Sequence, residues 1–241
     1  MLKNGSFEDG WTNLPPAPGN LINQQPQGWT LSWIKPGESL FGSGDKASQV
    51  PECLHKPSNT LPAHEHRGKP GALILDGDVT YKIFHRSGSF GAELRQTVTG
   101  LAPGSTGKLT VPIIVGGHAD GDVWAAESGV WVNGEGQWVN AGDMGDRRWY
   151  RHQLEFSVPD SGQIDIAIRF KSKWDLPKDF FIDDVRLESV EAGEGGVKPP
   201  SEHVVTLSLP AGWEVMTETG QPAGQVRLAV PDGTHVEVMK R

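Results

Sequence analysis

The sequence contains a single cysteine, Cys53, among its 241 residues, together with only two tyrosines and four methionines. One cysteine cannot form an intramolecular disulfide, and it excludes a zinc site built from several thiolates. No apolar run approaches the roughly 20 residues that a membrane-spanning helix requires. Basic residues are also in the minority: 22 lysines and arginines against 30 acids give a formal net charge of −8. Because an acidic chain is a poor partner for phosphate backbones, the composition argues against nucleic-acid binding.

The first residues, MLKNGSFEDGW, lack the apolar segment that a secretory signal peptide needs. The compartment therefore stays open. The chain acts outside the cell or on a surface if a leader precedes it, and inside a cell or in a phage particle otherwise.

Glycine and proline are abundant, at 31 and 18 residues, and both disfavour helix interiors. Short segments with an apolar residue at every second position recur between turn sequences rich in Gly, Asp and Asn. These segments lie at 72–76, 79–84, 93–99, 108–115, 128–133, 150–158, 163–170 and 180–188. The pattern predicts an all-β fold, in which two antiparallel sheets pack as a jelly roll or β-sandwich without long helices.

Two stretches interrupt this pattern. Residues 34–70 are rich in Pro, Gly, His and Lys, and we expect a long functional or mobile loop there. Residues 191–201, EAGEGGVKPPS, have the composition of a linker. The sequence thus predicts a β-sandwich module over 1–190 and a small β-rich segment over 202–241. Roughly 40 residues can hardly form a core of their own, so this segment should pack on another subunit, giving a homo-oligomer, or belong to a further domain.

Three short motifs are informative when taken together. The N-terminus reads NGSFEDGW over 4–11, the middle reads LRQTVTGLAPG over 94–104, and the end reads FIDDVRL over 181–187. In this order among β segments, they make residues 1–190 similar to carbohydrate-binding modules of the family 4, 9, 16 and 22 type. The resemblance implies a two-sheet sandwich that binds an oligo- or polysaccharide without catalysis and holds a structural calcium ion.

The resemblance also implies which groups bind calcium: the backbone carbonyls of Ser6 and Gly71 and the carboxylates of Glu8 and Asp183. All are hard oxygen donors of the kind that calcium collects in sets of roughly six to eight. Asp184 competes with Asp183, because adjacent strand residues face opposite sides and only one can reach the ion. The alternative is that Glu8 and Asp183 are ordinary surface acids at strand ends.

A candidate ligand-binding residue follows from the alternation in SGVWVN at 128–133. If Val130 and Val132 face the core, Trp131 must point to the opposite side of its sheet. An exposed tryptophan ring suits stacking on a sugar. The alternative is that the 34–70 stretch covers the ring.

Three further residues are weaker candidates for ligand contact. Arg169 alternates with the isoleucines of 163–170, so its guanidinium either hydrogen-bonds sugar hydroxyls or is simply solvated. Trp124 and Trp174 flank turns, where aromatic side chains either hold a ligand or cap the end of a sandwich.

Catalytic motifs are missing from the sequence: it contains no nucleotide-binding loop, zinc-protease helix or serine-hydrolase elbow. Glycoside hydrolysis needs two carboxylates at a defined separation, and no motif surrounds Glu127 or Glu155. A non-catalytic, calcium-containing carbohydrate-binding module is therefore the leading hypothesis. A structural or adhesion module of a phage or surface assembly is the second, and a polysaccharide-acting enzyme is the third.

Overall fold

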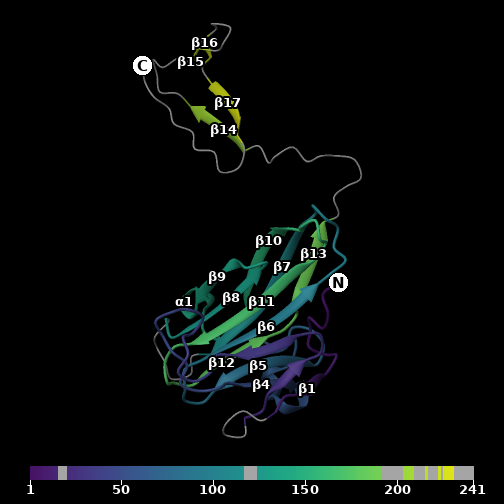
Figure 1. Cartoon of the computed structure of the whole chain (residues 1–241), viewed down its shortest axis with the longest axis vertical. Helices are drawn as coiled ribbons and strands as arrows, with labels where there is room; N and C mark the ends of the chain where they lie inside the picture. The colour runs from purple at the N-terminus through teal and green to yellow at the C-terminus, as the bar shows by residue number, and fades with distance from the viewer. Residues whose placement is uncertain are drawn as a thin grey trace. The chain divides into compact units, whose positions relative to one another are not determined.

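The fold was analysed in a computed structural model, which describes residues 1–15, 21–116 and 124–190. Beyond these it describes only four short strands, at 203–208, 215–216, 222–223 and 225–230. The chain divides into two compact units, Met1–Ala192 and Gly193–Arg241, both drawn in Figure 1. The linker expected at 191–201 lies outside the described residues, as does part of the β-rich segment expected at 202–241.

The first unit is a β-sandwich of two antiparallel sheets (Figure 1), which confirms the predicted all-β fold class. One sheet has the order β10-β7-β12-β5-β4, with β13 also paired to β7. Its strands are β4 (Glu52–Pro57), β5 (Val79–His85), β7 (Thr106–Gly116), β10 (Tyr150–Ser157), β12 (Lys178–Ile182) and β13 (Arg186–Val190). The other sheet has the order β3-β6-β11-β8-β9. Its strands are β3 (Thr30–Trp33), β6 (Phe90–Val98), β8 (Ala126–Val132), β9 (Glu135–Asn140) and β11 (Ile164–Ser172).

The remaining elements are short. A two-stranded sheet joins β1 (Trp11–Asn13) to β2 (Gln24–Pro26), and the described helices are η1 (Ser58–Thr60), η2 (Ala63–Glu65) and α1 (Ala141–Met144). In the second unit β14 (His203–Ser208) pairs with β17 (Gln225–Val230), and β15 (Val215–Met216) pairs with β16 (Pro222–Ala223). Among the described residues, no helix has the length and apolarity needed to cross a membrane.

The core lies between the two sheets and follows the alternation of the sequence. On β11 the inward side chains are Ile164, Ile166, Ile168 and Phe170, all at most 1% exposed. They belong to one hydrophobic cluster with the inward side chains of β7, which are Leu109, Val111, Ile113 and Val115. Because successive strand residues face opposite sides, the residues between the isoleucines of β11 lie on the outer face of their sheet.

The outer face of the β10-β7-β12-β5-β4 sheet is partly covered by the chain between β4 and β5. Leu61 and Leu73 from this segment pack with Ile114, Phe181 and Trp149 in a second, smaller hydrophobic cluster. The Trp149 indole N–H donates to the Ala72 carbonyl at 2.8 Å. A groove is instead found on the outer face of the other sheet.

Three sequence predictions of secondary structure are wrong. Residues 72–76 form an irregular segment with bends rather than a strand, and Leu73 packs onto a sheet face instead of pairing along an edge. The strand expected over 180–188 is two strands, β12 and β13, interrupted where Asp184 has a φ of 56°. The stretch 34–70 is not one long loop, since it contains the strand β4 with the buried side chains of Cys53 and His55.

Candidate ligand-binding groove

The pairing register brings polar side chains from three strands together on the outer face of the β3-β6-β11-β8-β9 sheet. Ala167 on β11 lies between Arg95 on β6 and Trp131 on β8. Two residues further along β11, Arg169 pairs with Glu93 of β6. A small residue at Ala167 therefore leaves space between larger neighbours on both sides.

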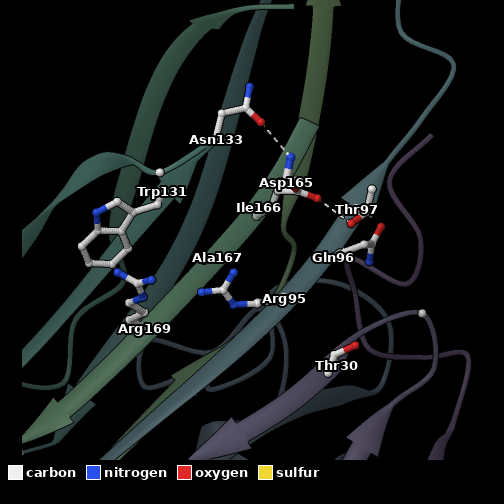
Figure 2. Close-up of a pocket in the computed structure, with 12 residues that line it drawn as sticks. Thr30, Arg95, Gln96, Thr97, Trp131, Asn133, Asp165, Ile166, Ala167 and Arg169 are labelled. Carbon is white, nitrogen blue, oxygen red and sulfur yellow. Dashed lines mark hydrogen bonds between the residues drawn. The ribbon is translucent and has the colours of Figure 1, made fainter. Parts of the chain in front are cut away.

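A groove with a volume of about 720 Å³ runs over this face. Figure 2 shows the side chains that line it, which come from β3, β6, β11 and the end of β8. Its polar members are Thr30, Arg95, Gln96, Thr97, Asn133, Asp165 and Arg169. A smaller hollow of about 210 Å³ adjoins it, since Arg95 and Arg169 line both. The lining is thus rich in planar hydrogen-bonding groups and contains one large aromatic ring, Trp131.

One end of the groove is held by hydrogen bonds to Asp165 (Figure 2). The Thr97 hydroxyl donates to Asp165 Oδ1 at 2.6 Å, and the Asp165 amide donates to Asn133 Oδ1 at 2.9 Å. Asn133 and Gly134 form the two-residue turn between β8 and β9, with φ values of 53° and 87°. Asn-Gly is the preferred sequence for this tight hairpin turn because both positions need a positive φ. The turn thereby places the Asn133 side chain beside β11.

Gln96 is buried and fixed in place at the neighbouring edge of the groove. Its side-chain carbonyl accepts from the Lys3 amide at 2.7 Å, and its side-chain N–H donates to the Lys3 carbonyl at 2.9 Å. These reciprocal bonds join β6 to the N-terminal segment, so Gln96 acts mainly as a structural amide.

Trp131 lies outside the main core cluster, on the outer face of its sheet, so its predicted facing is confirmed. The expectation of an exposed ring is wrong, because only 7% of Trp131 is accessible. The ring extends over Gly129 and Gly136, where a Cβ atom would come within 2.5 and 2.7 Å of ring atoms. Trp138 meets it edge to face at 4.9 Å, and the Arg169 guanidinium lies 4.5 Å from the ring centroid. The ring therefore supports Arg169 rather than standing open to a ligand.

The 34–70 stretch reaches this face through Phe41. The Phe41 ring lies 5.3 Å from Trp138 and 5.4 Å from the Arg169 guanidinium carbon. The insertion therefore adds to the packing around Trp131, which agrees in part with the alternative that it covers the ring.

Each acidic side chain at the centre of this face is shared by two basic ones. Glu93, only 7% exposed, accepts hydrogen bonds from both Arg95 and Arg169. The hydrogen bond to Glu93 raises the pKa of Arg95 above its ordinary value. Glu127 pairs in the same way with Lys171 and Lys173.

Trp124 and Trp174 lie at the opposite end of the strands from Asn133. Trp124 precedes β8 and Trp174 follows β11, and the two chain segments are joined where the Lys173 amide donates to the Ala125 carbonyl at 2.8 Å. The two rings are 58% and 47% exposed, respectively, and neither lines the groove. The structure therefore brings Arg169 and Trp131 together and leaves Trp124 and Trp174 apart from them.

Two of the residues assigned to calcium by resemblance bind the same turn of the chain. Glu8, in the N-terminal segment with Ser6, accepts from the amides of Asp78 and Val79 at 2.8 and 2.7 Å through Oε1. The approach is close at Gly77, where a Cβ atom would lie 2.3 Å from that oxygen. The Glu8 carboxylate therefore joins the N-terminal segment to the start of β5.

Asp183 is fully buried and binds the preceding part of that turn. Oδ2 accepts from the amides of Leu75 and Asp76 at 2.7 and 3.1 Å, and Oδ1 accepts from Asp184 at 2.7 Å. Burial raises the pKa of Asp183 to about 7, although these three bonds act in the opposite direction. Gly71 is exposed and lies beside His64, four residues before the first of these amides.

These observations test whether the residues fit a calcium ion. Within the described ranges, no basic side chain pairs with Asp183 and no three His, Cys, Asp or Glu side chains converge. A buried carboxylate that no described basic side chain pairs with can act as a ligand of a hard cation, although the three backbone amides already bond both of its oxygens. Calcium is thus compatible with Asp183 and Glu8, whereas Gly71 is not among the groups that contact either carboxylate.

Comparisons with known proteins yield structural similarities only. No protein-family model matches the sequence, and no curated protein is similar to it. Similar solved structures include a family 61 carbohydrate-binding module in complex with β-1,4-galactotriose, at 17% identity and a TM-score of 0.48, covering 78% of this chain and 97% of that one.

Two further structures are similar over comparable lengths. A family 4 carbohydrate-binding module matches at 16% identity and a TM-score of 0.40, covering 79% of this chain and all of that one. The enzymatically active domain of tailspike protein 4 from bacteriophage CBA120 matches at 13% identity and a TM-score of 0.46, covering 78% of this chain but 21% of that one.

Proposed function

We propose that the first unit binds an oligo- or polysaccharide in the groove on the outer face of the β3-β6-β11-β8-β9 sheet. The observation that carries this proposal is the lining: fixed, planar hydrogen-bonding groups from Arg95, Asn133, Asp165 and Arg169 surround a floor at Ala167. Sugars present hydroxyl groups that both donate and accept, and such groups are recognised by convergent amide, carboxylate and guanidinium side chains.

The shape of the site also favours an extended ligand. The main groove and the adjoining hollow meet at Arg95 and Arg169, and together they pass from the β8–β9 turn across β11 and β6 to β3. An apolar ligand would leave these charged groups desolvated and unpaired, which is costly. A chain of sugar units can instead hydrogen-bond along the whole path.

A substitution that fills part of the groove with a large side chain tests the proposal. Thr30 lines the groove and lies exposed on the edge strand β3, so Thr30→Trp adds bulk to the groove without entering the core. We expect Thr30→Trp to abolish or strongly weaken the glycan binding that calorimetry or affinity electrophoresis detects in a panel of neutral and acidic polysaccharides. Thr12→Trp, at an exposed position of β1 outside the groove, is the matched control and should bind as the parent does. Equal binding by both variants would place the glycan site elsewhere.

The proposed role is binding without catalysis. Hydrolysis of a glycosidic bond requires one carboxylate as acid and a second as base or nucleophile, roughly 5–10 Å apart. Asp165 is the one carboxylate that lines the main groove among the described residues, and the nearby Glu93 is held by two arginines. This arrangement favours a binding site. Release of reducing ends from any bound polysaccharide, lost in Asp165→Asn, would instead indicate an enzyme.

We also propose a structural calcium ion held by Glu8, Asp183 and backbone carbonyls such as that of Ser6. The support is the buried Asp183 carboxylate, which has no basic partner among the described side chains. A bound ion would join the N-terminal segment to the end of β12. Removal of calcium by a chelator should lower the melting temperature, and Asp183→Asn should abolish that calcium-dependent increment while Asp160→Asn retains it. If the melting curve is the same before and after a chelator has removed all metal from the protein, the ion is excluded.

An assembly module is the second candidate, because three large apolar side chains are exposed near one end of β8 and β11. Trp124, Trp174 and Leu176 are 58%, 47% and 41% exposed, at the end of β8 and β11 far from Asn133. Exposed apolar side chains of this size often mark an interface. Concentration-dependent sedimentation that disappears in Trp174→Ser would support a self-associating module, whereas a monomer at all concentrations would argue against one.

A further inference from the structure

Two arginine side chains converge on the floor of the groove from neighbouring strands. Figure 2 shows the Arg95 guanidinium extending from β6 over β11 toward Arg169, whose own guanidinium lies beside the Trp131 ring. Both donate to one carboxylate, that of Glu93. The shared carboxylate holds the two like-charged groups on the same floor and neutralises one of their two charges.

Neither arginine uses all its donors within the protein. Arg169 donates to Glu93 only through Nε, so both of its terminal nitrogens remain without an acceptor among the described residues. Arg95 uses Nε and Nη2, which leaves Nη1, and its side chain is 54% exposed. Several N–H groups of the two guanidiniums are therefore available to a ligand in the same groove.

The charge balance at this point differs from that of the whole chain. Two arginines and one glutamate leave one positive charge in excess at the arginine pair, in a protein whose net charge is −8. Asp165, at the other end of the groove, balances this charge over the groove as a whole. The other group of this kind, Lys171 and Lys173 around Glu127, is largely buried, with lysine side chains 6% and 16% exposed. The arginine pair is thus the accessible positive site on this face.

Asp165 limits where a negative group can bind. It lies four residues before Arg169 on β11, which corresponds to roughly 14 Å along a strand. It is nearer to Arg95, which lies opposite Ala167 and feels the charge of Asp165, so the Arg169 side of the pair is the more favourable place for an anion. It is exposed and accepts from Thr97. An anionic group should therefore avoid the Asp165 end of the groove and bind at the arginine end, while uncharged hydroxyls meet Asp165 and Asn133.

We propose that the groove selects an acidic glycan by binding a uronic-acid carboxylate between Arg95 and Arg169. The inference rests on the proposed glycan-binding function and specifies its ligand class. A carboxylate accepts two parallel N–H bonds from a guanidinium, and such charge-assisted pairs are roughly twice as strong as neutral ones. Trp131 and Glu93 serve as positioning residues, because they hold the Arg169 side chain against the sheet.

The experiment compares acidic glycans with neutral counterparts in the full chain. The acidic probes are polygalacturonate, alginate and a glucuronan, and the counterparts are methyl-esterified pectin, galactan and a glucan. The variants are Arg95→Gln, Arg95→Lys and, as a matched control with the same charge change, Arg151→Gln on the exposed side of β10. Arg95 is the better target than Arg169, since it does not pack on Trp131. Melting curves confirm that each variant is folded.

We expect at least one uronan to bind more tightly than its neutral counterpart, and this binding to weaken as salt increases. Arg95→Gln should reduce the affinity for that uronan roughly tenfold or more. Arg95→Lys should reduce it less, and Arg151→Gln should change it less than about twofold.

Four results would overturn the inference. If neutral glycans bind at the groove and no uronan binds more tightly, the groove is a neutral sugar site, and the proposed function stands without this inference. If a uronan binds but Arg95→Gln has no effect, the carboxylate site is elsewhere. If dextran sulfate binds as tightly as the uronan, the site recognises negative charge in general rather than a carboxylate group. If no glycan binds, the proposed function fails as well.

Discussion

Truncation of Trp131 to alanine should destabilise the first unit strongly, although the side chain lies outside the main core. Only 7% of Trp131 is accessible, between Trp138, Arg169 and two glycines. A tryptophan side chain contributes roughly 150–250 Å² of buried surface, which at ~25 cal/mol per Å² corresponds to about 4–6 kcal/mol. This is an upper bound because the unfolded chain already buries part of that surface.

The expected loss in the free energy of unfolding for Trp131→Ala is therefore about 3–5 kcal/mol, the range found for large aromatic residues in cores. In a domain of this size, about 1 kcal/mol lowers the melting temperature by roughly 2–4 °C, so the shift should be roughly 6–20 °C. Urea titration and calorimetry measure both quantities. Trp174→Ala makes the same chemical change at a position that is 47% exposed, and it should cost less than about 1 kcal/mol.

A double-mutant cycle separates the contribution of Arg169, which lies 4.5 Å from the Trp131 ring centroid. We expect a coupling free energy of roughly 0.5–2 kcal/mol between Trp131→Ala and Arg169→Met. If Trp131→Ala is no more destabilising than Trp174→Ala, the ring is not packed as described, and a ring open to the ligand becomes the better account.

Three further predictions concern packing, titration and domain organisation. Gly129→Ala should destabilise the protein by about 1–3 kcal/mol in urea titrations, because the new Cβ would lie 2.4 Å from the Gln137 carbonyl oxygen and 2.5 Å from the Trp131 ring; an unchanged midpoint would contradict this contact. Burial lowers the pKa of His152 to about 4, so protonation favours the unfolded chain, and the contribution of His152 to stability should fall as the pH drops from about 6.5 to about 4. His152→Gln should reduce the change in the free energy of unfolding with pH by the equivalent of one proton, about 1.4 kcal/mol per pH unit. If this pH dependence is unaltered, the lowered pKa of His152 is wrong. A chain ending at residue 191 should remain folded with an unchanged melting temperature of the first unit; loss of cooperative unfolding would show that later residues complete its core.

The alternation of apolar residues identified six strands and their inward faces directly. In β11, isoleucine at every second position leaves one arrangement in which all are buried, since a shift by one residue would expose the whole row. The Asn133-Gly134 pair likewise marks a tight hairpin, because few other sequences adopt a positive φ at two successive positions. The facing of Trp131 and Arg169 followed from the same period.

The two edge strands of the β3-β6-β11-β8-β9 sheet could not be predicted in this way. β3 and β9 contain few apolar residues and are partly accessible at the sheet edges, so their alternation is weak. The segment 72–76 misled in the opposite direction. Its apolar residues predict a strand, but the segment packs against the face of a sheet instead. A local pattern cannot distinguish a short apolar strand from a short apolar segment that covers a sheet.

The composition of the groove depended on tertiary structure. Alternation places Glu93 and Arg95 on one face of β6, but the register that sets Arg169 opposite Glu93 comes from the packing of two strands about 70 residues apart in sequence. The burial of Trp131 likewise requires Gly136 and Trp138 on the next strand and Phe41 from the 34–70 stretch. The local sequence determines which side of a strand a residue faces, because the backbone period is local. Which side chains from other strands meet it there depends on long-range pairing, so only the folded structure decided that an arginine pair, rather than an open tryptophan ring, lies at the centre of the groove.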